Sequence, residues 1–210
     1  MWCTMQDLET GWYFPPADLD GAGGSLRPLF SSAEKELGFV PNVFRAYGYR
    51  PERFSAWFAH YRQLHQPTEN LTAADREMVA VVVSSLNRCT YCVVSHSASL
   101  REHLGDAAMA DRIAVNWRHA GLTEKHRVIC EFAEVLTVAP HTVSLADLER
   151  LESVGLTRDE VWDVAEIGAM YAFTNRLALA TGQMPNDEYY EHGRCGCGSP
   201  HTASTNGASR

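Results

Sequence analysis

The sequence predicts an all-α fold. Apolar residues recur at helical spacing along most of the chain, and no segment alternates apolar and polar residues over a useful length. Capping patterns and glycines stand where such helices would begin and end. The 210 residues, of which 45% are hydrophobic and 21% charged, have the balance of an ordinary globular protein. We therefore expect one all-α domain.

The first two predicted helices cover residues 51–64 and 72–86. Pro51 suits a first helical turn, because its missing N–H costs nothing there. One apolar face follows at helical spacing: Phe54, Trp57, Phe58, Tyr61 and Leu64. Thr72 with Asp75 resembles a capping box. Residues 78–83 alone would also suit a buried strand, but the capping pattern and the continuation to Leu86 favour a helix.

Five further helices are predicted at residues 89–104, 107–120, 123–138, 144–154 and 157–180. Four glycines fall where the C-terminal ends need them: Gly105, Gly121, Gly155 and Gly182. Ser144 and Thr157 open two more capping-box patterns. Residues 157–180 are apolar nearly all round, which indicates a central helix or one sealed by a partner subunit. Glu166 and Arg176 on that helix need partners, either each other or a second subunit.

The two ends of the chain differ from this body. Residues 1–25 are rich in Gly, Pro and Asp, and we interpret them as an irregular arm. Residues 192–210 hold no large aliphatic side chain, so we expect a flexible tail that cannot offset its chain entropy. The predicted all-α domain therefore covers residues 26–191.

Charge and hydropathy exclude several classes of function. A net charge of −8 makes the chain a poor candidate for nucleic acid or an anionic membrane surface. The longest apolar run, residues 78–83, is far too short to span a bilayer. The N-terminus lacks a basic region followed by an apolar one, so we expect a cytoplasmic protein. Its six cysteines are then thiols, redox groups or metal ligands rather than a disulfide framework.

One short stretch gathers the candidate catalytic side chains: Glu77, Cys89, Cys92 and His96. On a helix, Cys89, Cys92 and His96 share one face. Asn87-Arg88 marks a helix break, which would put both thiols in a first turn, where the helix dipole and a nearby imidazole favour the thiolate. His96 can take the proton from Cys92 and return it, and Glu77 can orient or charge that histidine.

Other interpretations of Cys-x-x-Cys fit less well. Zinc needs four ligands, but the next histidine after His96 is His103, outside the usual gap, and no second Cys-x-x-Cys is present. Haem attachment needs histidine where Val93 stands, and a thioredoxin-type motif needs a βαβ unit. Two buried structural thiols beside a structural histidine stay an alternative. We expect no metal and no cofactor.

The spacing Glu-x11-Cys-x2-Cys-x3-His resembles the alkylhydroperoxidase D and carboxymuconolactone decarboxylase-like superfamily, and more closely its peroxidase-related branch. The resemblance runs from about residue 29 to residue 193. It is carried by GFVPNVFRA at 38–46, REM at 76–78, VSSLNRC at 83–89, NWR at 116–118, FAE at 132–134 and NRLA at 175–178.

This resemblance implies a bundle of helical hairpins in a homo-oligomer and a thiol peroxidase acting on hydrogen peroxide or small organic hydroperoxides. By position, Cys92 matches the peroxide-attacking cysteine and Cys89 the resolving one, while Glu77 and His96 match the proton relay. A dithiol or thioredoxin-like reductant would restore the dithiol. The best-studied branch has histidine where Tyr91 stands here. A phenol can donate a hydrogen bond but cannot relay protons near neutral pH.

Two other functions stay open at this point. One is proton-transfer chemistry on a lactone or similar acid, as in the decarboxylase branch, although that chemistry has no use for a dithiol. The other is a non-enzymatic redox-sensing oligomer. Among the remaining cysteines, Cys130 and Cys3 are expected to be inert. Cys195 and Cys197 either pass electrons to the active-site disulfide or are incidental thiols of the tail.

Overall fold

The computed structural model describes residues 12–19 and 26–194. All of the regular elements within these ranges are helices, so the all-α prediction is confirmed. The α-helices are α2 (Arg27–Leu37), α3 (Asn42–Tyr47), α4 (Pro51–Leu64), α5 (Ala73–Leu86), α6 (Thr90–Leu104), α7 (Ala107–Asn116), α8 (Glu124–Val138), α9 (Leu145–Ser153), α10 (Arg158–Thr181) and α11 (Glu188–Glu191). Two short 3-10 helices, η1 (Trp117–His119) and η2 (Pro140–Thr142), join them.

The predicted helix ends are largely confirmed. Thr72, Ser144 and Thr157 each form a capping box with the acidic residue three positions later. Gly105 and Gly182 end α6 and α10 with φ of 64° and 70°, a left-handed conformation that glycine adopts without strain. The helix predicted over residues 107–120 ends earlier, because the Asn116 side chain accepts from the N–H of Arg118 and caps a separate 3-10 turn.

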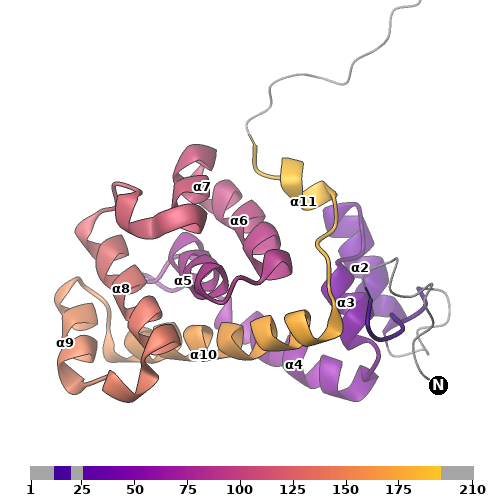
Figure 1. Ribbon diagram of the computed structural model, residues 1–210, viewed down its shortest axis with the longest axis horizontal. Helices are drawn as coiled ribbons and strands as arrows, with labels where there is room; N and C mark the ends of the chain where they lie inside the picture. Colours follow the sequence, from indigo (N-terminus) through magenta and orange to yellow (C-terminus); the bar gives the residue numbers. More distant parts are fainter. Residues whose placement is uncertain (1–11, 20–25, 195–210) are drawn as a thin grey trace, which may run out of the picture.

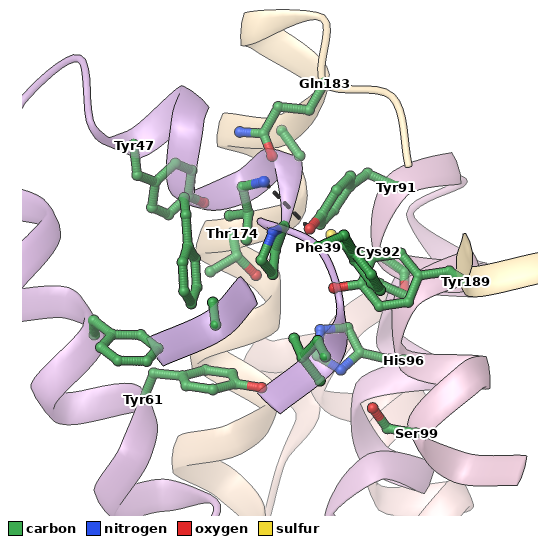
Figure 2. Close-up of a pocket in the computed structure, with 18 of the residues that line it drawn as sticks. Phe39, Tyr47, Tyr61, Tyr91, Cys92, His96, Ser99, Thr174, Gln183 and Tyr189 are labelled. Atoms are coloured by element: carbon green, nitrogen blue, oxygen red, sulfur yellow. Dashed lines mark hydrogen bonds between the residues drawn. The ribbon is translucent and has the colours of Figure 1, made fainter. Parts of the chain in front are cut away.

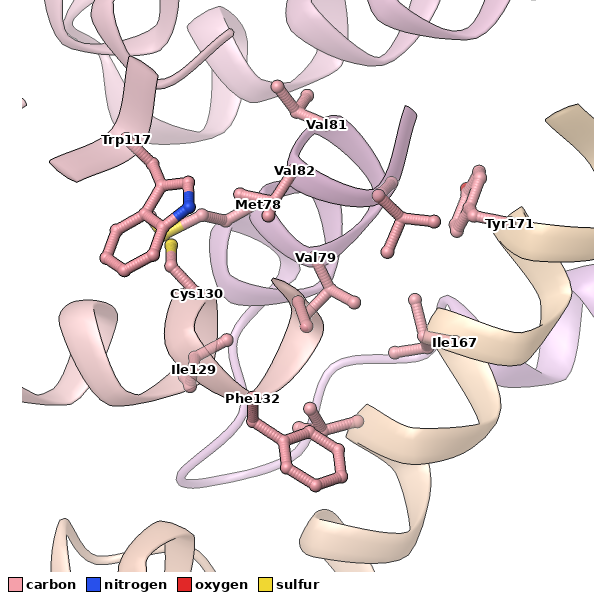
Figure 3. Packing of buried hydrophobic residues seen from close by; sticks show 14 of the residues in the cluster. Met78, Val79, Val81, Val82, Trp117, Ile129, Cys130, Phe132, Ile167 and Tyr171 are labelled. Atoms are coloured by element: carbon pink, nitrogen blue, oxygen red, sulfur yellow. The ribbon is translucent and has the colours of Figure 1, made fainter. Parts of the chain in front are cut away.

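Helix α5 is the centre of the molecule. Figure 1 shows it nearly end-on, with α6, α7, α8 and α10 around it. Its residues from Asp75 to Ser84 are all buried. Met78 and Val79 pack against Ile129 and Phe132 of α8 and Ile167 of α10 (Figure 3). Each fully buried side chain of this size stabilises the fold by about 1.5–3 kcal/mol.

Buried charges tie α5 to its neighbours. The Asp75 carboxylate lies 2.7 Å from Lys125 Nζ and 3.2 Å from His126 Nε2, both on α8. Burial alone would raise the pKa of Asp75, but the hydrogen bonds from these two side chains and from Thr72 hold it well below its ordinary value. Arg76 bonds Asp163 of α10 at 2.7 Å.

Helix α10 is not buried on most of its faces within the single chain, so of the two expected alternatives the central helix is wrong and the helix sealed by a partner subunit stays a prediction. One side packs on α5 and α8 through Val161, Val164 and Ile167. The other side is open in this chain, with Trp162 71% and Phe173 55% exposed. Glu166 and Arg176 do not pair with each other: Glu166 instead contacts His60, 3.4 Å away.

Helices α2, α3 and α4 form an aromatic layer over one end of α10. Phe30, Phe44, Tyr47 and Phe54 are its buried members. Trp57 of α4 joins the layer to the core, with its Nε1 3.1 Å from the sulfur of Met170. Of these three helices only α4 is predicted from the sequence, because α2 begins without a side-chain cap and α3 is only six residues long.

Several predictions about the chain ends concern residues outside the described ranges. These include most of the predicted arm at 1–25, the tail beyond residue 194, and Cys3, Cys195 and Cys197. None of the helices among residues 12–19 and 26–194 combines the length and hydropathy that crossing a bilayer requires.

Candidate active site

The two cysteines of Cys-x-x-Cys meet at the junction of α5 and α6. Helix α5 ends at Leu86, and Arg88 turns the chain with a left-handed φ of 55°. Cys89 is then the N-cap of α6 rather than part of its first turn, and Cys92 lies within that turn. The two Sγ atoms are 3.0 Å apart, and both side chains are buried. The predicted break at Asn87-Arg88 thus brings the thiols together.

The two thiols are joined by a hydrogen bond, and their pKa values move in opposite directions. The hydrogen bond from Cys92 lowers the pKa of Cys89, and the backbone N–H groups of Cys92 and Tyr91 at the helix N-terminus add to this shift. The same hydrogen bond and burial raise the pKa of Cys92. The expectation that the helix N-terminus favours both thiolates therefore holds for Cys89 alone in the reduced pair.

Cys92, the cysteine with the raised pKa, is the one that the cavity reaches. A cavity of about 530 Å³ lies between α2, α3, α4, α6 and α10, and Cys92 lines it whereas Cys89 does not. Figure 2 shows Cys92 beside Tyr91, with His96 further along α6. A molecule in the cavity thus meets Cys92 first, with Cys89 behind it.

Aromatic rings form a large part of the cavity wall. They come from α3, α4, α6, α10, α11 and the residues just before α3, whereas α2 adds only aliphatic and polar side chains. The rings are those of Phe39, Phe44, Tyr47, Trp57, Phe58, Tyr61, Tyr91, Tyr171 and Tyr189. The apolar face predicted for residues 51–64 is the face of α4 that lines the cavity. Tyr61, which belongs to that face, is therefore part of the site. Such a wall suits an apolar ligand of substantial size.

Glu77 joins two histidines beneath the cysteine pair. Its Oε2 lies 2.7 Å from Nδ1 of His96, and its Oε1 lies 3.3 Å from Nδ1 of His65 at the end of α4. The Tyr171 hydroxyl lies 2.7 Å from Nε2 of His65 and 3.3 Å from Nδ1 of His96. The structure thus brings Glu77 to His96, as the sequence suggests, and adds His65 and Tyr171.

The electrostatics of this network keep its carboxylate ionised. Burial alone would raise the pKa of Glu77, but the charge of His96 and the hydrogen bond from His65 hold it well below its ordinary value. Burial raises the pKa of Tyr171 well above its ordinary value, so this phenol keeps its proton. A buried carboxylate between two imidazoles can hold a proton on either ring.

His65 and Tyr171 are not among the site residues predicted from the sequence. His65 stands four residues after Tyr61, which is one helical turn further along the same face of α4. That spacing is the sequence signal that could have identified it. Tyr171 is hidden among the apolar residues of α10, and nothing in the sequence separates it from them. Only the packing of α10 on α5 places its hydroxyl at the histidines.

Tyr91 occupies a structural position beside Cys92. Its hydroxyl accepts a hydrogen bond from the N–H of Val43 at 3.3 Å, and its ring meets Tyr189 edge-on at 6.5 Å between centroids. Burial raises the pKa of Tyr91 well above its ordinary value. Tyr91 therefore links α6 to α3 and lines the cavity. Because it keeps its proton, it cannot relay protons as an imidazole at this position would.

A buried amide supports the cysteine turn from α10. Asn175 donates to Ser84 Oγ and accepts from the Asn87 side chain, both at 2.9 Å. This amide also lowers the pKa of Cys92, against the larger opposing effects of Cys89 and burial. Asn175 therefore favours the Cys92 thiolate.

The remaining sequence expectations concern metals and Cys130. Among the described residues, no three His, Cys, Asp or Glu side chains gather in a way that would hold a metal ion. Cys130 is buried in the core between α5 and α8 and does not line the cavity. Burial raises the pKa of its thiol. Such a thiol is unreactive.

Comparisons with known proteins agree with this geometry. The profile of the Carboxymuconolactone decarboxylase family matches residues 51–134, which include both cysteines, Glu77 and His96. A peroxidase-related protein from Ralstonia eutropha JMP134 with an alkylhydroperoxidase AhpD core is 37% identical and superposes with a TM-score of 0.83, covering 86% of this chain and 95% of that one.

This chain belongs to the alkylhydroperoxidase D and carboxymuconolactone decarboxylase-like superfamily. The membership confirms the resemblance drawn from the sequence. A second peroxidase-related member, from Silicibacter sp. TM1040, is also 37% identical, with a TM-score of 0.80 over 86% of this chain and 96% of that one.

This chain is also similar to part of a larger protein. Human Sestrin-2 is 25% identical to this chain over 164 residues, which are 77% of this chain and 32% of Sestrin-2. The chain thus spans about a third of the length of this curated relative. By contrast, this chain covers nearly the whole length of the two peroxidase-related proteins.

Proposed function

We propose that this protein is a thiol peroxidase that reduces hydroperoxides through a Cys89–Cys92 dithiol and disulfide cycle. The observation that carries the proposal is the arrangement of the two sulfurs: one lines the cavity, and the other lies 3.0 Å behind it. The superfamily membership and the two peroxidase-related structures support the same reaction class.

In the first step, the Cys92 sulfur attacks the terminal oxygen of the hydroperoxide. An S–O bond forms, the O–O bond breaks, and Cys92 is oxidised to a sulfenic acid while the hydroperoxide is reduced to an alcohol or to water. His96, one helical turn from Cys92 on α6, takes the thiol proton and returns it to the leaving oxygen. The Glu77 carboxylate stabilises the positive charge of the protonated His96 ring, with Oε2 of Glu77 2.7 Å from Nδ1 of His96.

In the second step, Cys89 attacks the sulfur of the Cys92 sulfenic acid. The S–S bond forms, and hydroxide leaves and becomes water by taking a proton. The backbone N–H groups of Cys92 and Tyr91, which also lower the pKa of Cys89, favour this attack, because the thiolate is the nucleophile. A dithiol or thioredoxin-like reductant then transfers two electrons, becomes a disulfide itself and restores both thiols.

The decisive experiment compares single cysteine variants after rapid addition of cumene hydroperoxide. Cys89→Ser is expected to accumulate a sulfenic acid on Cys92, which dimedone traps for mass spectrometry. Cys92→Ser is expected to lose turnover, and Cys130→Ser serves as the matched control with a core thiol. Turnover that survives the loss of both Cys89 and Cys92 would contradict the proposal. Activity on a lactone that depends only on Glu77 and His96 would instead indicate proton-transfer chemistry.

We also propose that the protein forms a homo-oligomer through the open side of α10. The outward residues follow a 4-3-4-3-4 spacing, typical of a helix seam: Trp162, Glu166, Ala169, Phe173, Arg176 and Ala180. This order of spacings reads the same in reverse. An antiparallel second copy of α10 therefore places Glu166 opposite the partner's Arg176, and Phe173 opposite the partner's Ala169.

The seam is complementary to itself in charge and in size. Each large ring faces a small side chain, since Trp162 meets the partner's Ala180 in the same register. A twofold interface of this kind repeats each contact, so two Glu–Arg pairs flank two Phe–Ala contacts. Covering Trp162 and Phe173, which are 71% and 55% exposed in the single chain, supplies the apolar driving force. Sedimentation of the purified chain measures the assembly.

A further inference from the structure

Two side chains that line the cavity each carry a buried polar atom with no hydrogen-bond partner within the described part of the chain. One is the hydroxyl of Tyr47 on α3, and the other is Oε1 of Gln183, just after α10. Their side chains are only 8% and 5% exposed, respectively. An unpaired buried polar group is costly and is rare in folded proteins, so two of them facing one cavity require an explanation.

Both side chains face the place where the reaction occurs. Each lines the cavity that Cys92 lines, and in Figure 2 Tyr47 lies on the side opposite Tyr91 and Cys92, with Gln183 at the top of the view. The amide nitrogen of Gln183 donates to Thr181 Oγ1 at 3.2 Å, which leaves its oxygen directed elsewhere. The N–H of Gln183 also bonds the carbonyl of Ala178, a residue packed against Cys92.

The two atoms offer one donor and one acceptor. Burial raises the pKa of Tyr47, and the nearby cysteine pair raises it further, so the phenol keeps its proton and can donate. The amide oxygen of Gln183 can only accept. A hydroperoxide group carries the matching pair, since its O–H donates and its oxygens accept.

We propose that Tyr47 and Gln183 form a binding site for the oxygen function of an organic hydroperoxide whose apolar, ring-sized group is held by the aromatic wall. In this site the Tyr47 hydroxyl donates to a peroxide oxygen, and the hydroperoxide O–H donates to Gln183 Oε1. This inference rests on the proposed peroxidase function and narrows its substrate class. A cavity of about 530 Å³ is of the size that binds organic ligands and far larger than hydrogen peroxide requires.

The alcohol product shares this chemistry and allows binding to be measured without turnover. We use 2-phenyl-2-propanol, the product of cumene hydroperoxide, which both donates and accepts. Acetophenone is the paired probe, because its carbonyl accepts but cannot donate. Calorimetric titration of each probe into reduced wild-type protein, Tyr47→Phe and Gln183→Met separates the two hydrogen bonds. Tyr49→Phe is the control, since Tyr49 is exposed and does not line the cavity.

The proposal predicts a distinct pattern. Tyr47→Phe weakens both probes by about tenfold, whereas Gln183→Met weakens the alcohol by about tenfold and leaves acetophenone unchanged. The melting temperature of Tyr47→Phe does not fall, because the hydroxyl has no partner to lose within the described chain. Oxidation of the dithiol by diamide, which needs no peroxide site, is unchanged in both variants.

Each failure has its own meaning. If neither probe binds the wild-type protein, or if both variants bind both probes as the wild type does, the binding site is refuted. A fall in melting temperature without a change in binding also refutes it, since Tyr47 is then structural. If the binding pattern holds but no hydroperoxide oxidises Cys92, the peroxidase function fails while the binding site stands.

Discussion

Glu77 and His96 lie 19 positions apart in the sequence and on different helices, yet Oε2 of Glu77 is 2.7 Å from Nδ1 of His96. The contact fixes α6 against the buried central helix α5 and points the imidazole along the face of α6 that carries Cys92. Because Glu77 is buried and ionised, its negative charge compensates the positive charge that the neighbouring imidazole gains when it takes up a proton.

Glu77→Gln is expected to lower kcat/KM for cumene hydroperoxide by about 100-fold, the usual contribution of a positioned proton relay. The amide keeps the shape of the carboxylate but not its charge, so His96 loses the partner that stabilises its protonated form. Stopped-flow measurement of peroxide consumption tests this. Glu152→Gln, which removes only an exposed partner of Arg158, is the control. Equal rates for Glu77→Gln and wild type would remove Glu77 from the mechanism.

His65→Gln is expected to move the acidic limb of the pH–rate profile to higher pH. The hydrogen bond and charge of His65 help to lower the pKa of Glu77, so their loss raises that pKa. Glu77 then takes up a proton at a higher pH, and the ionised relay is lost earlier as the solution is acidified. The control is His60→Gln, on the same helix but 45% exposed. Superimposable profiles for the two variants would show that His65 does not act through Glu77.

Asp75→Asn is expected to reduce the free energy of unfolding at pH 7 by about 3 kcal/mol, because it leaves Lys125 beside a neutral group. The folded-state pKa of Asp75 is depressed, so its ionised form contributes stability above the unfolded pKa of about 4. This contribution is lost as the pH falls toward the folded-state pKa, and the variant should show a shallower loss over that window.

Urea unfolding followed by circular dichroism over a pH series measures both effects. Asp147→Asn is the matched control, because Asp147 plays the same capping-box role at α9 but is only partly buried. The difference between the two variants isolates the buried charge cluster from the helix cap. A loss of the same size in both would mean that Lys125 and His126 contribute nothing beyond the cap.

Arg176→Glu is expected to dissociate the oligomer, because it sets Glu166 opposite an acidic side chain in the antiparallel seam of α10. The double variant Glu166→Arg/Arg176→Glu should restore assembly by exchanging the two charges. Sedimentation velocity at low salt measures the distribution of species. Arg158→Glu, on the same helix but outside the seam, should sediment as the wild type. A monomeric wild-type protein, or a double variant that stays dissociated, would overturn this register.

The helices and their ends are readable from the sequence, because the signals that set them are local. The capping boxes at Thr72, Ser144 and Thr157 and the glycine after α10 need only residues within one or two turns. Cys89, Cys92 and His96 are also only three and four positions apart, so their place on one helix face can be predicted from local spacing. Helices α3 and α11 are missed because such short helices depend on packing rather than on periodicity, and α2 is missed because it begins without a side-chain cap.

The sequence by itself determined the all-α class, the superfamily and the residues of the Cys-x-x-Cys motif with Glu77 and His96. Only the tertiary structure decided how those residues divide the work. The assignment of access to Cys92 and of the lowered pKa to Cys89 depends on a cavity walled by helices far apart in the chain. His65, Tyr171, Tyr47 and Gln183 join the site for the same reason. Burial and hydrogen bonding arise between helices, and no spacing within one helix encodes them.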